Sequence, residues 1–379
     1  MTQLGSQRWR FAIPDDVAYF NTASMSPLLH SVRDAGERGL QRRAQPWTIA
    51  SQDWFDDAER LRRFFASLIG AGADGVALVP ATSYGLGIAA RNLAATASHQ
   101  VLVLADEFPS NFYTWQRFAR RTGAELVVVE RERGQPWTDA VLPAIGERTR
   151  IVAVPNVHWT NGAVLDLDAV ATRARDAGAA LCIDASQSLG VMPLDVERLR
   201  PDFVVAVGYK WMLGPFTVGY MYVAEQHRDG EPLEEAWINR VGSDDFAAVA
   251  DYSDGYLPGA RRFDVGQRGN FGLLPMAIAA VEQLLDWGVV NVASALREVT
   301  DEIDARVAAL GLTRDAPEQR GPHMLGVDLP RDAARRVAVL LRERGVVASV
   351  RGTALRIAPH LHVVASDIDR LVEGLAAAL

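Results

Sequence analysis

The chain has 379 residues, of which 49% are hydrophobic and 23% charged, and its formal net charge is -8. This composition is typical of a globular protein with a large and a smaller domain, and the negative charge argues against a nucleic-acid-binding surface. Because the sequence begins without a secretory signal, has no apolar run of membrane-spanning length and contains one cysteine, Cys182, we expect a cytoplasmic protein without internal disulfides or multi-thiolate metal sites.

Amphipathic stretches at 31–45 and 53–68 precede a series of short apolar runs that are rich in β-branched residues. The runs lie at 76–79, 101–104, 126–129, 151–154, 181–183 and 203–207. Helical patterns separate most of them, at 86–93, 113–121, 139–145 and 167–177. Strands that alternate with helices predict a parallel, doubly wound α/β sheet.

The pattern changes after residue 210. A Gly214-Pro215 turn leads directly into an apolar run at 217–223, and a connection this short predicts a strand antiparallel to its predecessor. The region 232–259 has no clear period. A long helical pattern follows at 273–310, then a strand at 324–327, a helix at 332–344, and strands at 346–350 and 354–357. We therefore predict a large α/β domain at 15–260 and a small α+β domain at 1–14 and 261–379.

Lys210 is the only lysine in the chain, against 38 arginines. Under such a bias a surface lysine is easily replaced by arginine. A lysine that must lose a proton and attack a carbonyl group is not, because arginine stays protonated. From composition alone, the survival of one solvated lysine remains an alternative.

Several polar side chains follow the predicted strands, and the carboxyl ends of strands form the ligand-binding edge of an open α/β sheet. Thr82 and Ser83 stand where a helix should begin, which favours an anion but is also usual for a helix cap. Phe108 and Asp184 follow two other strands. A lone phenylalanine at such a place is more often part of the core, and Asp184 is poised to pair with a buried cation, although it could merely cap the next turn. Together with Lys210, these groups suit pyridoxal phosphate, which needs an anion site, a flat partner, a carboxylate and an amine.

Longer stretches carry a family resemblance. They are NTASMSP near the N-terminus, DASQSLGVMPLDV at 184–196, PDFVVAVGYKWMLGPFTVGYMYV at 201–223 and LRIAPHLHVVASDIDRL at 355–371. With them the chain resembles the class V aminotransferase and cysteine desulfurase family of fold-type I pyridoxal-phosphate enzymes over almost its whole length. The resemblance implies a mostly parallel seven-stranded sheet in the large domain, pyridoxal 5'-phosphate as cofactor and a small-molecule amino acid as substrate.

The resemblance also implies roles for residues. Lys210 would be the Schiff-base lysine, Asp184 the partner of the ring nitrogen and Gln187 a donor to the ring hydroxyl. Thr82 and Ser83 resemble phosphate ligands.

Tyr209 is similar to the tyrosine that reaches phosphate in kynureninase-like members, and Phe108 is similar to their ring-stacking phenylalanine. Arg356 matches the arginine that holds the substrate carboxylate by a bidentate pair, although a solvated strand-edge arginine is an alternative. Asn21 is expected beside the substrate.

Three positions depart from the family pattern. Desulfurases relay sulfur through a small-domain cysteine, whereas Cys182 lies in a predicted strand and is expected to be inert. His158 stands where members often have asparagine, and is either a general base or only a hydrogen-bond donor. Gln267 and Arg268 replace an element that reaches the neighbouring subunit's phosphate. Arg268 is expected to bind phosphate or carboxylate, or else to be an interface residue; a loop that crosses in this way requires a homodimer.

These roles predict that Lys210 removes the α-proton of an amino acid while Asp184 keeps the cofactor ring cationic. We favour a lyase that acts by β-elimination of a sulfur-containing or other β-substituted amino acid, because the desulfurase cysteine is missing and the ring-stacking segment resembles lyase members. The alternatives are an aminotransferase, an epimerase-like enzyme, and an inactive scaffold that binds the cofactor. The joint presence of Lys210, Asp184 and Arg356 argues against a scaffold.

Overall fold

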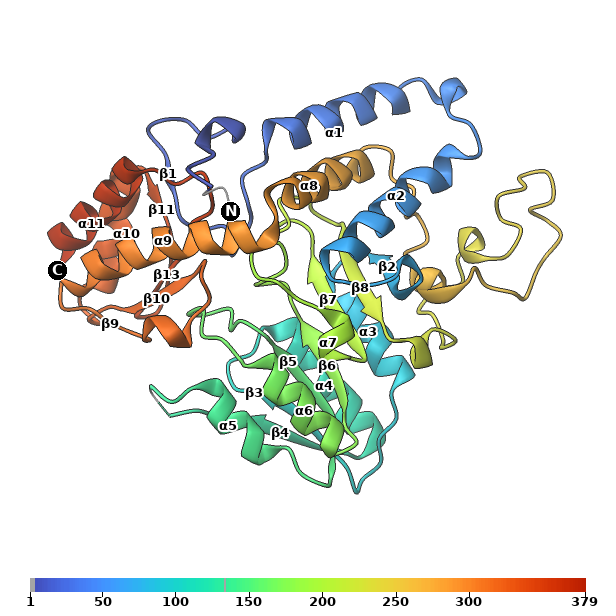
Figure 1. The fold of residues 1–379 in the computed structure, drawn as a ribbon, viewed down its shortest axis with the longest axis horizontal. Coiled ribbons are helices and arrows are strands. Elements are labelled where there is room, and N and C mark those ends of the chain that lie inside the picture. Colours follow the sequence, from blue (N-terminus) through green and yellow to red (C-terminus); the bar gives the residue numbers. More distant parts are fainter. Residues whose placement is uncertain (1–3, 133) are drawn as a thin grey trace.

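The computed structural model describes residues 4–132 and 134–379, and a seven-stranded sheet forms its centre (Figure 1). The strand order is β2-β8-β7-β6-β5-β3-β4. The strands are β2 (Val76–Val79), β3 (Gln100–Leu104), β4 (Glu125–Val129), β5 (Thr149–Pro155), β6 (Ala180–Asp184), β7 (Phe203–Val207) and β8 (Gly219–Val223). β8 is antiparallel to both β2 and β7, whereas the other neighbours are parallel, so the predicted fold class and the antiparallel last strand are confirmed.

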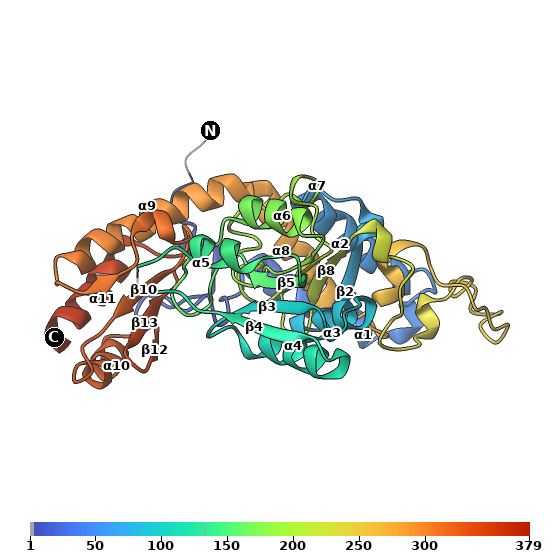
Figure 2. The ribbon, with the colours of Figure 1, turned by 90° about the horizontal axis from the view of Figure 1, so that it is seen from below.

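Helices cover both faces of this sheet because its strands are apolar on both sides. Along β7, Phe203 and Val205 join one apolar cluster, and Val204 and Ala206 join the other. Figure 2 shows α4 and α6 on opposite sides of the sheet. The helices in this part of the chain are α1 (His30–Arg43), α2 (Asp53–Leu68), α3 (Thr82–Asn92), α4 (Pro109–Thr122), α5 (Trp137–Ala144), α6 (Leu167–Asp176) and α7 (Val196–Leu199).

The helical pattern predicted at 273–310 forms two helices, α8 (Leu273–Trp287) and α9 (Val289–Ala308), which meet at an angle of 78°. The break is Gly288, whose φ of 74° lies in the left-handed region that glycine tolerates. α8 packs on α1 and α2, and α9 continues towards the C-terminal part (Figure 1). No single helix within the described residues is both long and apolar enough to cross a membrane. The bent pair of α8 and α9 has the length and apolar composition of such a segment only when the two helices are taken together.

The C-terminal part contains a four-stranded antiparallel sheet with the order β12-β13-β10-β9. Its elements are β9 (Thr313–Arg314), β10 (Leu325–Asp328), α10 (Ala334–Glu343), β12 (Ser349–Arg351), β13 (Ala354–Ile357) and α11 (Ala365–Ala378). The single strand predicted at 346–350 is divided, because β11 (Val346–Val347) pairs with β1 (Ala18–Tyr19) while β12 pairs with β13. The N-terminal segment is thereby attached to this part.

The two ends of α9 pack into different apolar clusters. Leu296 belongs to the cluster beneath the large sheet, whereas Ile303 belongs to the cluster of the small sheet. The domain division predicted between residues 260 and 261 stays a prediction, and residues 1–3 of the predicted small domain lie outside the described residues. Short 3-10 helices complete the fold: η1 (Arg8–Arg10), η2 (Pro46–Thr48), η3 (Ala73–Gly75), η4 (Glu225–His227), η5 (Trp237–Asn239), η6 (Gly259–Phe263) and η7 (Pro317–Gln319).

Candidate active site

A cavity of about 310 Å³ lies where several strands of the large sheet end. It is lined mainly by residues that follow β2, β3, β5, β6 and β7. Among the residues predicted from the sequence, those in its wall are Thr82, Ser83, Phe108, Asp184, Gln187, Tyr209 and Lys210. The carboxyl edge of the sheet thus brings together groups that are far apart in the chain.

Lys210 is buried in this wall, on a loop that leads from β7 to β8. The loop is closed by hydrogen bonds from the Gly208 N–H to the Val218 carbonyl and from the Gly214 N–H to the Gly208 carbonyl. A Cβ atom at Gly208 would lie 2.5 Å from the Val218 carbonyl oxygen, so this close approach requires glycine. Burial lowers the pKa of the Lys210 ammonium from 10.5 to about 8. The neutral, nucleophilic amine is therefore far more populated near neutral pH than in an ordinary lysine.

Asp184 is the last residue of β6 and is fully enclosed. Burial raises the pKa of its carboxyl group, while hydrogen bonding to Ser186 and the charge of Lys210 act in the opposite direction. The Ser186 N–H donates to Oδ1 of Asp184 at 2.9 Å. A cation placed against this carboxylate would restore its ionised form, because the burial penalty falls when an opposite charge is near.

Thr82 and Ser83 occupy the first turn of α3, where backbone N–H groups are free of partners within the helix. The Thr82 hydroxyl lies 2.9 Å from the Ser186 hydroxyl. Gly85 brings this turn close to the sheet, since a Cβ atom there would lie 2.7 Å from Val205 Cγ1. The arrangement is an anion site built from a helix terminus and hydroxyl groups.

Phe108 stands at the start of α4 with its ring towards the lysine. The centroid of the ring lies 5.2 Å from Lys210 Nζ. The preceding residue, Glu107, accepts a hydrogen bond from the Phe108 N–H at 2.6 Å, and its other oxygen, Oε2, is buried without a partner in the part of the chain that the structure describes. Burial and the charge of Asp184 raise the pKa of Glu107 from 4.5 to about 8.

Gln187 and Tyr209 complete the wall near the lysine. The Gln187 amide donates to the Ala23 carbonyl and accepts from the Trp211 indole N–H, which fixes its orientation. Tyr209 is half-buried, with its ring 4.6 Å from that of Phe216. Burial raises the pKa of the Tyr209 hydroxyl, so this group is a neutral hydrogen-bond donor.

Arg356 comes from β13 of the small sheet and is buried beside Asn21. Its guanidinium donates to the Trp159 carbonyl at 2.7 Å and to the Ser24 hydroxyl at 2.7 Å, and Asn21 Oδ1 lies at 3.5 Å. Its Nε has no partner among the described residues. Burial and the nearby charge of Arg351 lower the pKa of Arg356 to about 10. A buried guanidinium with neutral partners is suited to a carboxylate ligand.

His158 lies outside this cavity. Its Nδ1 is 2.7 Å from the Thr160 hydroxyl, its Nε2 is 3.2 Å from the Ala105 carbonyl, and its ring stacks on Trp137. Burial lowers the pKa of His158 to about 4. With both ring nitrogens engaged, His158 supports the loop after β5, and its position argues against the catalytic role predicted for it.

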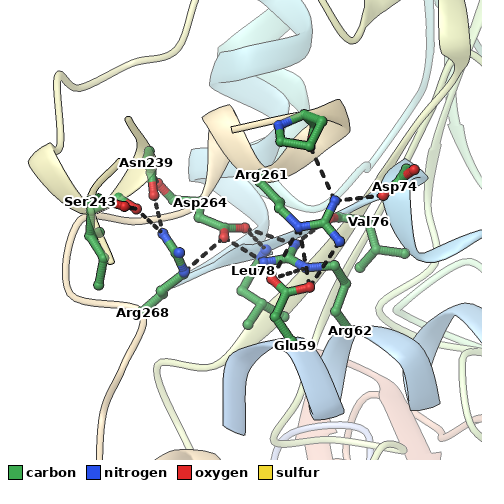
Figure 3. A network of polar contacts seen from close by, with 12 residues as sticks. Glu59, Arg62, Asp74, Val76, Leu78, Asn239, Ser243, Arg261, Asp264 and Arg268 are labelled. Carbon is green, nitrogen blue, oxygen red and sulfur yellow. Dashed lines mark hydrogen bonds and ion pairs between the residues drawn. The ribbon is translucent and has the colours of Figure 1, made fainter. Parts of the chain in front are cut away.

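Arg268 is also placed away from the cavity, in a buried polar network (Figure 3). It forms an ion pair with Asp264 at 3.2 Å and donates to the Ile238 carbonyl at 3.1 Å and to the Asn239 side chain. Its guanidinium therefore points into its own subunit. This position argues against the predicted contact with phosphate or substrate, because the carboxylate that neutralises Arg268 is Asp264.

The sequence did not single out Glu107, Trp159, Ser186 or Phe216, although all four line the cavity. Glu107 was visible only as the neighbour of Phe108. Trp159 directly follows His158, and which of two adjacent residues faces the site depends on the turn after β5.

A model of the family described as aminotransferase class-V matches residues 19–365. The chain belongs to the class V aminotransferase family. It is 29% identical to an uncharacterized aminotransferase, YcbU, of Bacillus subtilis over 88% of this chain and 91% of that one. It is 28% identical to isopenicillin N epimerase of Streptomyces clavuligerus over 98% and 97% of the two chains, and 29% identical to kynureninase of Deinococcus radiodurans over 99% and 93%.

Among solved structures, a variant of the protein C-DES with glycine covalently linked to its pyridoxal-phosphate cofactor has the same fold. The TM-score is 0.87 with 20% sequence identity, over 98% of this chain and 99% of that one.

Class V aminotransferases are pyridoxal-phosphate-dependent enzymes, and this chain has the groups that the cofactor needs. The first turn of α3 would hold the phosphate, Phe108 would stack on the ring, and Asp184 would face the ring nitrogen. The amine of Lys210 would form the covalent bond to the aldehyde carbon of the cofactor. The lowered pKa of Lys210 and its position beside the Phe108 ring fit this assignment.

Proposed function

We propose that this enzyme acts on an α-amino acid and that Lys210 moves the proton at the α-carbon. The observation that carries the proposal is the environment of Lys210, a buried amine with a pKa of about 8 that faces an aromatic ring and an anion site in one cavity. Pyridoxal phosphate, when bound, supplies an electron sink for the charge that develops at the α-carbon.

The remaining groups bind and orient. Arg356 holds the α-carboxylate of the substrate, since it is a buried guanidinium whose hydrogen-bond partners, Trp159, Ser24 and Asn21, are all neutral. Asp184 keeps a cationic ring nitrogen in place, and Phe108 covers the ring and excludes water from that side. These roles place the α-carbon between Lys210 and Arg356.

For the reaction we favour β-elimination. The Cα–H and Cβ–S bonds of an S-substituted cysteine break, and with one water the products are a thiol, pyruvate and ammonium. Support comes from Cys182, which is buried at the centre of the sheet and whose thiol pKa is raised by that burial. It is unsuited to carry sulfur as a nucleophile, so sulfur would leave as a thiol.

A second candidate is amino transfer to a keto acid, favoured by the 29% identity to an aminotransferase of Bacillus subtilis. Assays with a panel of S-substituted cysteines and other amino acids distinguish β-elimination from amino transfer. Elimination yields pyruvate and ammonium without any added keto acid. Amino transfer that requires a keto acid and releases no ammonium would overturn the lyase proposal.

The role of Lys210 is tested by Lys210→Arg, which keeps the positive charge. We expect the variant to lose the visible absorbance of attached cofactor and to lose activity by several orders of magnitude. Because Lys210 is the only lysine in the chain, borohydride reduction of the wild type should attach the cofactor to one peptide, identified by mass spectrometry. A reduced wild type without that modified peptide contradicts the assignment.

We further propose that the enzyme works as a homodimer. Support comes from a patch of large apolar side chains whose rings contact one another, made of Trp54, Trp237, Phe246 and Phe271. The first three are exposed by 37%, 44% and 39%. An apolar patch of this kind is typical of a protein interface, and a second copy of the chain is the partner we propose.

A further inference from the structure

A second arginine of the small sheet faces the same site as Arg356. β12 and β13 are antiparallel, with Ser349 opposite Arg356 and Arg351 opposite Ala354. Side chains two residues apart in a strand lie on the same face, so Arg351 and Arg356 share one face of the hairpin. Arg351 Nε also donates to the Ser349 hydroxyl at 3.2 Å, directly across from Arg356.

The indole of Trp159 connects this arginine to the cofactor cavity. The guanidinium carbon of Arg351 lies 4.9 Å from the centroid of the Trp159 ring. The same ring meets Phe108 edge-on, with centroids 5.6 Å apart, and the Trp159 carbonyl accepts from Arg356. Trp159 therefore lines the cavity beside Phe108, with the guanidinium of Arg351 over its ring and that of Arg356 at its backbone carbonyl.

Three cationic groups lie near one another at this place, and the acidic group Asp184 faces Lys210. Arg351 and Arg356 both lower the pKa of Lys210, and Arg351 lowers that of Arg356, so the three cations lie within electrostatic reach of one another. The contacts recorded for Arg351 within the described residues are the neutral Ser349 hydroxyl and the Trp159 ring. Asp184 acts on Lys210, whereas the two arginines repel each other, and an anionic ligand between them would relieve that repulsion.

We propose that Arg351 is a specificity-determining residue that binds a second anionic group, at the end of the substrate's side chain. The inference rests on the proposed function, in which Arg356 already holds the α-carboxylate. One guanidinium satisfies one carboxylate by a bidentate pair. The substrate class is then an α-amino acid whose side chain ends in a carboxylate or another oxyanion. In β-elimination, this group would leave on the thiol fragment.

The test uses non-reacting ligands of matched length and the holoenzyme. Isothermal titration calorimetry compares succinate, glutarate and adipate with butyrate, pentanoate and hexanoate. We expect the best dicarboxylate to bind at least about tenfold more tightly than its monocarboxylate partner. Arg351→Gln should remove most of this preference and leave binding of the monocarboxylates within about twofold, because Arg356 is untouched. Arg335→Gln, which removes an exposed arginine from α10, is the matched control for net charge.

Two results would overturn the inference. If Arg351→Gln weakens both ligand series equally, Arg351 serves the α-carboxylate. If it weakens neither, Arg351 is a surface residue stacked on Trp159. Failure of the proposed function is seen separately, as the absence of α-proton exchange in deuterium oxide for any amino acid, with all variants retaining the visible absorbance of the bound cofactor.

Discussion

At the level of single residues, the cavity holds two carboxyl groups in different surroundings. Asp184 accepts hydrogen bonds from Ser186 and faces the charge of Lys210, whereas Glu107 Oε2 is buried without a partner in the described part of the chain. Burial raises the pKa of both groups, and for Glu107 it reaches about 8. When the lysine or a cationic ring pairs with Asp184, its carboxylate is the more stable of the two. Glu107 is then the protonated acid at neutral pH.

This difference predicts a pH-dependent effect of Glu107→Gln on stability. Because the pKa of Glu107 rises from 4.5 to about 8 on folding, the folded state binds the proton more tightly. The contribution of Glu107 to the stability of the wild type is therefore lost as the pH rises above 4.5, and the loss is complete above about 8. We expect the glutamine variant to be more stable than wild type by about 2–4 kcal/mol at alkaline pH, and to differ little at acid pH.

Urea unfolding of both proteins across this pH range measures the effect. Glu373→Gln, which removes an exposed carboxylate from α11, is the control for the loss of one charge. A difference between Glu107→Gln and wild type that does not vary with pH would show that Glu107 is ionised throughout.

At the level of elements, one buried carboxylate connects a helix to the strand that leads into the anion site (Figure 3). Asp264 accepts from Arg62 of α2 at 2.6 Å and from the Leu78 N–H of β2 at 2.7 Å, and it pairs with Arg268. Arg62 also donates to the Val76 carbonyl. The network therefore fixes β2, whose carboxyl end is followed by Thr82.

Asp264→Asn should consequently be strongly destabilising although it changes the shape of the side chain little. It leaves Arg62 and Arg268 buried without their shared carboxylate, and such a change costs about 3–5 kcal/mol. Guanidinium chloride unfolding measures the loss. Removal of all three members in Arg62→Met/Asp264→Leu/Arg268→Met should recover part of it, because neither arginine is then left buried without the carboxylate that they share. A loss below about 1 kcal/mol in Asp264→Asn would mean that water or another group neutralises the arginines.

Most strands of the large sheet were predictable because they are buried apolar runs followed by polar residues. Asp184 and Lys210 follow such strands, so their meeting at one edge could be deduced from the order of strands and helices alone. The bend at Gly288 could not be predicted from the sequence, since the apolar pattern continues on both sides of it. Only the φ of 74° in the structure reveals the break. Arg268 turned inward because Asp264, four residues earlier, neutralises it, and that pairing depends on tertiary burial.

The contact between Arg351 and Trp159 at the site also could not be predicted from the sequence. Trp159 follows β5 in the large domain, and Arg351 ends β12 in the C-terminal sheet, so neither sequence segment indicates the other. The hydrogen bond from Arg356 to the Trp159 carbonyl is one of the tertiary contacts that bring the two segments together. Substrate selectivity is therefore the part of the function that a sequence pattern specifies least.

At the level of the whole molecule, the active-site cavity opens beside exposed aromatic residues. Phe216, which lines the cavity, is 57% exposed. A second subunit that covers apolar surface of this kind would also shield the site from water, which strengthens the electrostatic interactions inside it. The homodimer and the catalytic site are therefore coupled in the proposed function.

Substitutions in the apolar patch test whether the homodimer and the catalytic site are coupled. Trp54→Ser/Trp237→Ser removes two aromatic side chains from the proposed interface, and tryptophan is enriched among the interface residues whose removal weakens binding by about tenfold or more, about 1.4 kcal/mol. We expect the wild type to be a dimer by light scattering and the double variant to dissociate at micromolar concentration, with activity that recovers as its concentration is raised. Trp9→Ser, at a tryptophan that is 68% exposed near the N-terminus, should leave the dimer intact. A wild type that is monomeric and fully active would exclude the homodimer, and a double variant that stays dimeric would place the interface on another face of the molecule.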